Sequence, residues 1–219
     1  MPPAASGIGY RNQPGGTEMN GRRILEIGGI VAGVVMIAFG VGALVMSINA
    51  RNTVSDEIQA EQIVGSPDMN PTAIATEAQE AGLTDIALPT CDVAEQPIDT
   101  GSDARCFAQY LRIHALESSG GLTYAQMGRF LAASDPTDPA GTNDDTAALQ
   151  DEDGKPVSNA ARNTWITATA LATALNVSYM AEQIALFGLI VGIALLLSGI
   201  GFVILALIVL GKHDKPTPA

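Results

Sequence analysis

The chain has 219 residues, a formal net charge of −12 at pH 7 and 47% hydrophobic residues. Most of the negative charge lies between two apolar runs, in a middle segment with six Lys and Arg against twenty Asp and Glu. An acidic segment of this kind disfavours nucleic acid as a partner, because phosphates are bound by basic surfaces.

The two apolar runs are Ile27–Ile48 and Ile184–Leu210, and neither contains a charged residue. Each is longer than the roughly 18–20 residues that a helix needs to cross a bilayer. A buried core helix is the alternative, but two such runs are hard to bury in a small domain. We therefore expect an all-α membrane protein with two transmembrane helices, for which the lipid bilayer is itself a partner.

The positive charges predict the orientation of the two spans. Arg22 and Arg23 precede the first run, and Lys212 and Lys215 follow the second. Basic residues next to a span stay on the cytoplasmic side. We therefore expect a helical hairpin in the plasma membrane with both termini inside and a mainly helical extracytoplasmic domain between the spans. The expected boundaries are a disordered cytoplasmic tail at 1–23, transmembrane helices at 24–49 and 183–210, the extracytoplasmic domain at 50–182 and a cytoplasmic tail at 211–219.

A cleaved signal peptide is the other interpretation of the first run. Its apolar stretch, however, exceeds the 7–15 residues of a signal-peptide core. We therefore expect it to remain as a membrane span.

Small residues recur four apart within the runs, and this spacing lets helices approach closely. The predicted packing residues are Gly29, Gly33, Ala38, Gly42, Gly188 and Gly192. A packed hairpin and a homo-oligomer both fit this pattern, as does the general abundance of glycine in membrane helices. Neither run contains an ionisable residue of the kind that marks a transport path, which argues against a transporter.

Helix signals follow in the middle segment. Asn70–Pro71 is typical of a helix start, and Gly82 of the end of that helix. Asp103 predicts the cap of a helix that runs through Ser118 and stops at Gly120–Gly121.

Thr123–Gln126 has the pattern of a capping box, after which Met127, Phe130 and Leu131 supply an apolar face. The segment at 134–158 is acidic and rich in turn-forming residues, and we expect a mobile loop there. Its acidic run lacks the spaced ligands of a calcium loop.

Ser158 or Asn159 then predicts the cap of a helix that continues into the second apolar run. One stripe of this helix has helical spacing and is expected to pack on the middle domain. It consists of Trp165, Ala168, Ala172, Leu175 and Tyr179.

Cys91 and Cys106 are the only cysteines, and both fall in the segment expected outside the cell. An even number of cysteines in an oxidising compartment favours a disulfide. A redox-active pair is the alternative, but the local C-x-x-C spacing is missing.

The segment Phe107–Ala125 contains His-Ala-Leu-Glu, a double glycine and Thr-Tyr-Ala. With these motifs it resembles a family of small actinobacterial membrane proteins that have two spans and an extracytoplasmic domain. The resemblance also covers the spans and residues 159–183, whereas the acidic insert and the cysteine loop depart from the compact members. Members are often labelled aromatic ring-opening dioxygenases by automatic transfer.

The dioxygenase label requires two histidines and a carboxylate around one iron. This chain has only His114 and His213, and the predicted topology separates them across the bilayer. We therefore assign no catalytic residue, metal ligand or cofactor. His114 and Glu117 share a helix face, where weak metal binding and ordinary packing near the helix end are both open.

The leading functional hypothesis is a non-enzymatic membrane protein whose outer domain contacts an envelope protein or a second copy of the chain. The alternative is an extracytoplasmic module that binds or senses a small ligand or cation. Its candidate contact residues are His114, Glu117, Tyr124 and Trp165.

Overall fold

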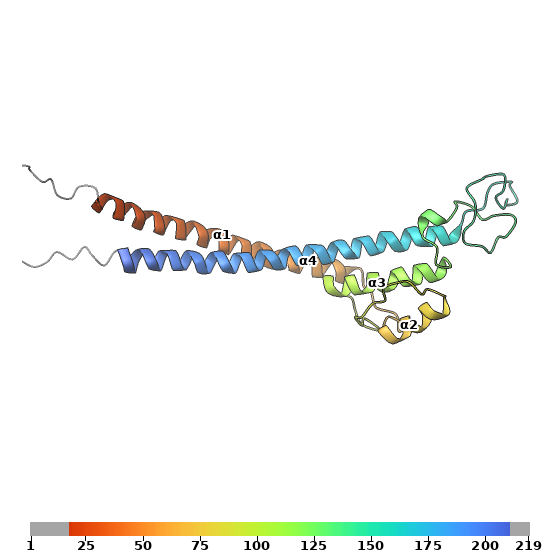
Figure 1. The fold of residues 1–219 in the computed structure, drawn as a ribbon, viewed down its shortest axis with the longest axis horizontal. Helices are drawn as coiled ribbons and strands as arrows, with labels where there is room; N and C mark the ends of the chain where they lie inside the picture. Colours follow the sequence, from red (N-terminus) through yellow and green to blue (C-terminus); the bar gives the residue numbers. More distant parts are fainter. Residues whose placement is uncertain (1–17, 211–219) are drawn as a thin grey trace, which may run out of the picture. The chain divides into compact units, whose positions relative to one another are not determined.

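A computed structural model describes residues 18–210 of the chain, which are mostly helical (Figure 1). Helix α1 spans Glu18–Ala60, α2 Pro71–Glu80, α3 Gly101–Ser118 and α4 Ala160–Leu205. A short 3-10 turn, η1, occupies Tyr124–Gln126, and a π-helical turn, η2, continues α4 over Ala206–Leu210. Residues 18–210 contain isolated β-bridges but no strand, which confirms the expectation of a helical protein.

Most of the predicted N-terminal tail and all of the C-terminal tail lie outside the described residues. The same holds for Lys212, His213 and Lys215, on which part of the orientation prediction depends.

Helices α1 and α4 are long and apolar enough to cross a membrane, judged by length and composition. Large apolar side chains along both helices face outward. Phe39, Met46 and Leu197, for example, are each more than 60% exposed.

The chain divides into two compact units. We call the described residues up to Met46 and from Gly188 onward the apolar unit, and Ser47–Phe187 the polar unit. Helices α1 and α4 contribute residues to both units.

Within the apolar unit, glycine forms the contact between α1 and α4. Gly33 and Gly40 on α1 are buried, as are Gly192 and Gly199 on α4, and each pair is spaced by seven residues. A methyl group on Gly33 would lie 2.7 Å from the carbonyl oxygen of Gly199, and one on Gly40 would lie 2.8 Å from the amide nitrogen of Leu196. The two backbones therefore approach so closely that only glycine fits at these positions.

The structure distributes the six predicted packing residues unevenly. Gly29, Gly33 and Gly192 lie at the contact, whereas a methyl group on Gly42 would have no neighbour within 4 Å. Ala38 is exposed, and Gly188 is partly buried. The observed repeat is seven residues rather than four, which is the spacing at which the same face of a helix recurs after two turns.

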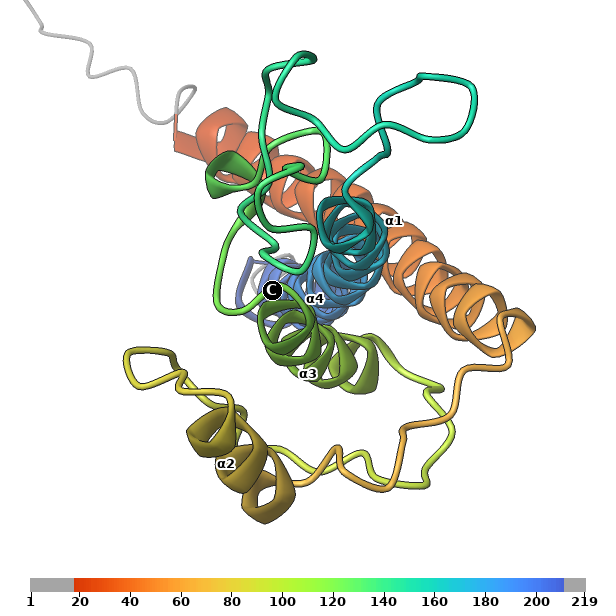
Figure 2. The same cartoon turned by 90° about the vertical axis from the view of Figure 1, so that its right-hand side faces the viewer.

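The polar unit is built around α3, which lies beside α2 (Figure 2). Its main core joins Ile58 of α1, Ile74 of α2, Phe107 and Tyr110 of α3 and Leu175 of α4. A smaller cluster contains Ala115, Leu116, Met127 and Trp165. The predicted apolar stripe of α4 thus faces these clusters, with Trp165 and Leu175 buried.

The caps of α2 and α3 explain where these helices begin. Asn70 accepts hydrogen bonds from the amides of Thr72 and Ala73, and Pro71 takes the first helical position, as predicted. The cap of α3 differs from the prediction. Thr100 is the N-cap, and Asp103 completes the capping box three residues later, because the helix starts one turn earlier than expected.

The segment after α3 departs further from the sequence pattern. The capping box of Thr123 and Gln126 forms, but the turn ends at Gln126 and Met127 has an extended backbone. The apolar face expected of Met127, Phe130 and Leu131 therefore does not lie on a helix. Phe130 instead exchanges two backbone hydrogen bonds with Thr142, and Leu131 accepts one from Leu149.

The acidic segment at 134–158 is a loop without helix or strand, but much of its backbone is hydrogen-bonded. Asn159 is fully buried, and its side-chain amide donates to the carbonyl oxygens of Gly128 and Pro139 at 3.1 and 2.8 Å. Its side-chain oxygen accepts from the amide of Arg162 at 3.4 Å. Asn159 therefore closes the loop and caps α4 at the same time.

A covalent bond and a buried hydroxyl tie the loop before α3 to that helix. Cys91 and Cys106 form the predicted disulfide, with an Sγ–Sγ distance of 2.06 Å. The Tyr110 hydroxyl donates to the carbonyl oxygen of Cys91 at 2.5 Å. Burial, and then the nearby Asp92, raise the pKa of Tyr110, so the neutral donor form is favoured.

We expect Gly33→Leu and Gly199→Leu each to destabilise the protein by about 1–3 kcal/mol, because the added side chains overpack a tight contact. Thermal unfolding of the purified protein in one detergent measures the effect. Gly42→Leu is the matched control, since its position is open. An equal decrease for all three variants would contradict this contact.

We expect reduction of Cys91–Cys106 to lower the free energy of unfolding by about 3 kcal/mol, the value for a closed loop of this length. The separation of the two cysteines is 15 residues. Urea unfolding with and without reductant tests this, with a Cys91→Ser, Cys106→Ser double variant as the control that no longer responds. Two alkylatable thiols in the unreduced protein would show that the bond is not formed.

Candidate metal centre

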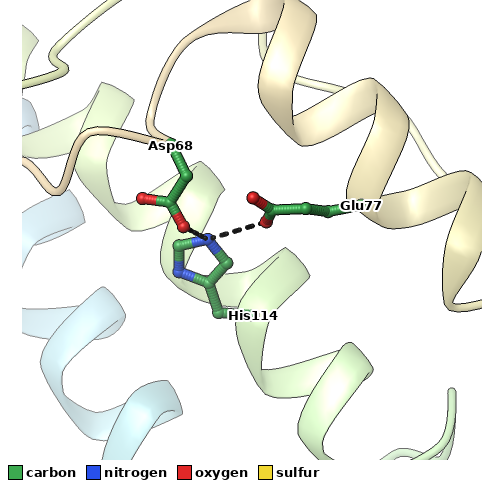
Figure 3. Close-up of side chains that lie close together, drawn as sticks. All are labelled: Asp68, Glu77 and His114. Atoms are coloured by element: carbon green, nitrogen blue, oxygen red, sulfur yellow. Dashed lines mark ion pairs between the residues drawn. The ribbon is translucent and has the colours of Figure 1, made fainter.

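Three ionisable side chains from three different segments meet in the polar unit (Figure 3). Asp68 lies in the loop before α2, Glu77 on α2 and His114 on α3. His114 Nε2 is 3.1 Å from Asp68 Oδ2 and 3.7 Å from Glu77 Oε2. All three ligand atoms lie within 4.8 Å of one another. Of these three residues, the sequence pattern had singled out only His114.

The loop that carries Asp68 is held by backbone hydrogen bonds to residues 91–98, the loop between α2 and α3 that contains Cys91 and that we call the cysteine loop. The amide of Gly65 donates to Gln96 O at 2.9 Å, and the amide of Val93 donates to Met69 O at 3.1 Å. A methyl group on Gly65 would lie 1.8 Å from the carbonyl oxygen of Val93, so this close approach requires glycine. The disulfide then links the cysteine loop to α3 and thereby to His114.

Hydrogen bonding also orients the Asp68 carboxylate. The Ser66 hydroxyl donates to Asp68 Oδ1, which leaves Oδ2 as the oxygen nearest to His114. Such a second partner behind a ligand is typical of metal sites, where it fixes the orientation of the ligand.

Packing positions the other two side chains. Ile74 and Ala78 of α2 are buried, and Glu77 lies about 60° from Ile74 around the helix, on the side away from Ala78. On α3, His114 follows the buried Ile113 and precedes the buried Ala115. The side chains of Asp68, Glu77 and His114 are 34%, 29% and 25% exposed, so the cluster is partly shielded from solvent.

The electrostatics of the cluster are unfavourable for a bare carboxylate. Burial and then the charge of Asp68 raise the pKa of Glu77, while His114 lowers it and Glu117 and Glu80 raise it further. The raising effects prevail. Burial, as the largest cause, and the negative charge of Asp68 thus disfavour the ionised form of Glu77.

His114 Nε2 is itself completely buried, and no described residue makes a hydrogen bond to it, although Asp68 Oδ2 lies only 3.1 Å away. The ring nitrogen thus points into the cluster without a well-directed partner. This is the orientation that a neutral imidazole needs in order to donate its lone pair to a metal.

The three ligand atoms match the chemistry of a divalent transition metal. Zinc is bound by His nitrogen and carboxylate oxygen at about 2.0–2.2 Å, which sets tetrahedral ligand atoms roughly 3.4 Å apart. The distances of 3.1 and 3.7 Å from His114 Nε2 to the two carboxylate oxygens bracket that spacing. Calcium prefers six to eight oxygen ligands, so a nitrogen ligand argues for a metal such as Zn²⁺ or Mn²⁺.

Of the four contact residues that the sequence singled out, only His114 belongs to the cluster. Glu117 is exposed and contributes no ligand atom to the cluster. Tyr124 is 45% exposed and lies under the Arg162 guanidinium, at 4.0 Å from the ring centre. Trp165 is buried beneath Arg112, at 5.6 Å.

Asp68 and Glu77 escaped sequence reasoning because they are distant from His114 along the chain. Asp68 follows Pro67 in a loop, and Glu77 occupies an ordinary position in a short helix. Neither has a spacing relative to His114 that corresponds to a local ligand motif.

No family model matches this chain, and neither a curated protein nor a solved structure is detectably similar to it. The resemblance based on Phe107–Ala125 stays a prediction.

Proposed function

We propose that this chain is a two-span membrane protein whose extracytoplasmic domain binds a divalent transition-metal cation. The ligands are Asp68, Glu77 and His114. The observation that carries the proposal is the convergence of these three ligand atoms within 4.8 Å. The buried Nε2 of His114 is directed at the two carboxylates.

The exposed apolar surface of α1 and α4 supports the membrane location. Soluble proteins rarely leave large contiguous apolar patches in water, whereas lipid accommodates them. Arg22 and Arg23 before the first run and Lys212 after the second favour cytoplasmic termini. The disulfide supports an outer location for the polar unit, because such bonds persist in oxidising compartments.

A metal accounts for the charges better than an ion pair alone. In an ion pair, protonated His114 would face Asp68 and Glu77 with Glu80 and Glu117 close by, which leaves a surplus of negative charge. A divalent cation between neutral His114 and the two carboxylates would balance the negative charges of Asp68 and Glu77. It would also join the Asp68 loop, α2 and α3, so that binding stabilises the fold of this domain.

We propose binding or sensing of the cation rather than oxygen chemistry. The cluster supplies one histidine, whereas the iron site of a ring-opening oxygenase of the facial-triad type uses two.

We expect Zn²⁺ or Mn²⁺ to raise the thermal stability of the purified chain, by about 2.7 kcal/mol at a free concentration of 100 times Kd. Mg²⁺ and Ca²⁺ should have much smaller effects. His114→Ala should abolish the stabilisation, and Glu57→Gln, on an exposed part of α1, should leave it unchanged. Calorimetric titration of the detergent-purified protein measures stoichiometry and affinity. Failure of every cation to stabilise the wild-type protein would overturn the proposal.

Glu77→Gln serves as the second variant in this experiment. Since the pKa of Glu77 is raised in the fold, its ionisation opposes folding as the pH rises through that pKa. The neutral side chain should therefore leave the metal-free protein as stable as wild type or more so, by roughly 0.2–1 kcal/mol, while metal binding is lost. A variant that is destabilised without metal and still binds Zn²⁺ normally would contradict the assignment.

A second candidate function is a non-enzymatic interaction with an envelope protein or with another copy of the chain. One observation favours it. Gly28 and Gly42 on α1 and Gly201 on α4 have no neighbour within 4 Å of an added methyl group, which leaves room for a further helix against either span.

We expect mild crosslinking in native membranes to yield a discrete complex, and Gly42→Leu or Gly201→Leu to weaken it. Gly33→Leu is not informative here, because it alters the contact within the chain. Quantitative co-purification with mass spectrometry provides the measurement. A solitary monomer at every crosslinker concentration would argue against this candidate.

A further inference from the structure

A second site lies between α3 and α4 in the polar unit, apart from the metal cluster. It is a cavity of about 260 Å³ lined by side chains of both helices. Arg112 and His114 are two residues apart on α3, which turns them about 200° from each other around the helix. The cavity and the cluster therefore lie on opposite sides of α3 and share no residue.

Alanines create this cavity. Ala108 and Ala115 of α3 and Ala168 and Ala172 of α4 all contribute to its lining. The neighbouring core uses much larger side chains. Where four alanine side chains face one another, they do not fill the gap between the two helices, and a space remains.

The lining of the cavity combines an apolar ring with a positively charged side chain. Trp165 is only 7% exposed and forms part of the lining, and the exposed Arg112 lies over its ring at 5.6 Å. No carboxylate of residues 18–210 pairs with Arg112, although the chain carries 23 acidic residues. An arginine fork without a carboxylate partner beside an apolar cavity is suited to bind a carboxylate from a ligand.

Polar groups of both helices complete the lining away from Trp165. Asn176 is part of the lining, and its side-chain amide donates to Ala172 O at 2.7 Å. Gln109 supplies a further amide.

We infer that this cavity binds a small organic monoanion, namely a carboxylate with a short apolar chain. The carboxylate pairs with Arg112, and the chain lies over Trp165 among the alanines. One arginine matches one negative charge. The volume is slightly below the roughly 300–1,000 Å³ of sites for drug-sized ligands, which restricts the ligand to a small molecule. This function goes beyond metal binding and does not depend on it.

The test uses the fact that Trp165 is the only tryptophan in the chain, so its fluorescence reports on this cavity alone. The full chain in nanodiscs is titrated with hexanoate, hexanol and hexylamine, which share the chain length and differ in charge. We expect a saturable fluorescence change with hexanoate, an affinity at least tenfold weaker for hexanol and no saturable change with hexylamine.

Two variants test the assigned contacts, and equilibrium dialysis with labelled hexanoate gives a readout independent of fluorescence. Arg112→Gln should weaken hexanoate binding at least tenfold, and Ala172→Leu should abolish it by filling the cavity. Arg129→Gln is the matched control, because Arg129 faces Asp145 and lies outside the cavity lining. If Ala172→Leu fails to fold, Thr173→Leu at the exposed side of the lining replaces it.

The inference is overturned by any of three results. The first is the absence of saturable hexanoate binding, the second is equal binding of hexanol and hexanoate, and the third is an unchanged hexanoate affinity in Arg112→Gln.

Discussion

Burial of α3 is the constraint on which the polar unit depends. Half of the residues of this helix are buried, and Tyr110 at its centre is fully enclosed. The same helix carries the disulfide through Cys106 and provides the wall against which α2 packs. Because α3 is fixed from several sides, its outward-facing residues hold defined positions. His114 and Arg112 can therefore present a nitrogen ligand and a cation at constant places without a large domain to support them.

Local signals in the sequence predicted the local structure well. Asn70–Pro71 identified the start of α2, and the glycine pair after Ser118 identified the end of α3, because caps and left-handed residues act over a few positions only. The long apolar runs predicted two helices because their length and composition can be read directly from a continuous stretch of sequence. The capping box at Thr123 was misleading, since a satisfied first turn does not ensure that the backbone continues as a helix once Met127 can be buried in an extended segment.

Long-range arrangement was beyond the reach of the sequence alone. His114 was a candidate because it shares a helix face with Glu117, but its partners Asp68 and Glu77 are two among many acids. Only the packing of α2 on α3 and the pairing of the Asp68 loop with the cysteine loop select them. The cavity at Trp165 was equally hidden. Its alanines fit the expected apolar stripe, and a sequence pattern does not reveal whether facing small residues leave a space.

The seven-residue spacing of the buried glycines in the apolar unit has a mechanical consequence. An undistorted helix drifts by only about 20° over seven residues, so one interval of this length keeps both glycines of each helix on the face toward the partner helix. Turning either helix about its own axis would drive larger side chains into this contact at every glycine at once. The pair therefore resists rotation along its whole contact.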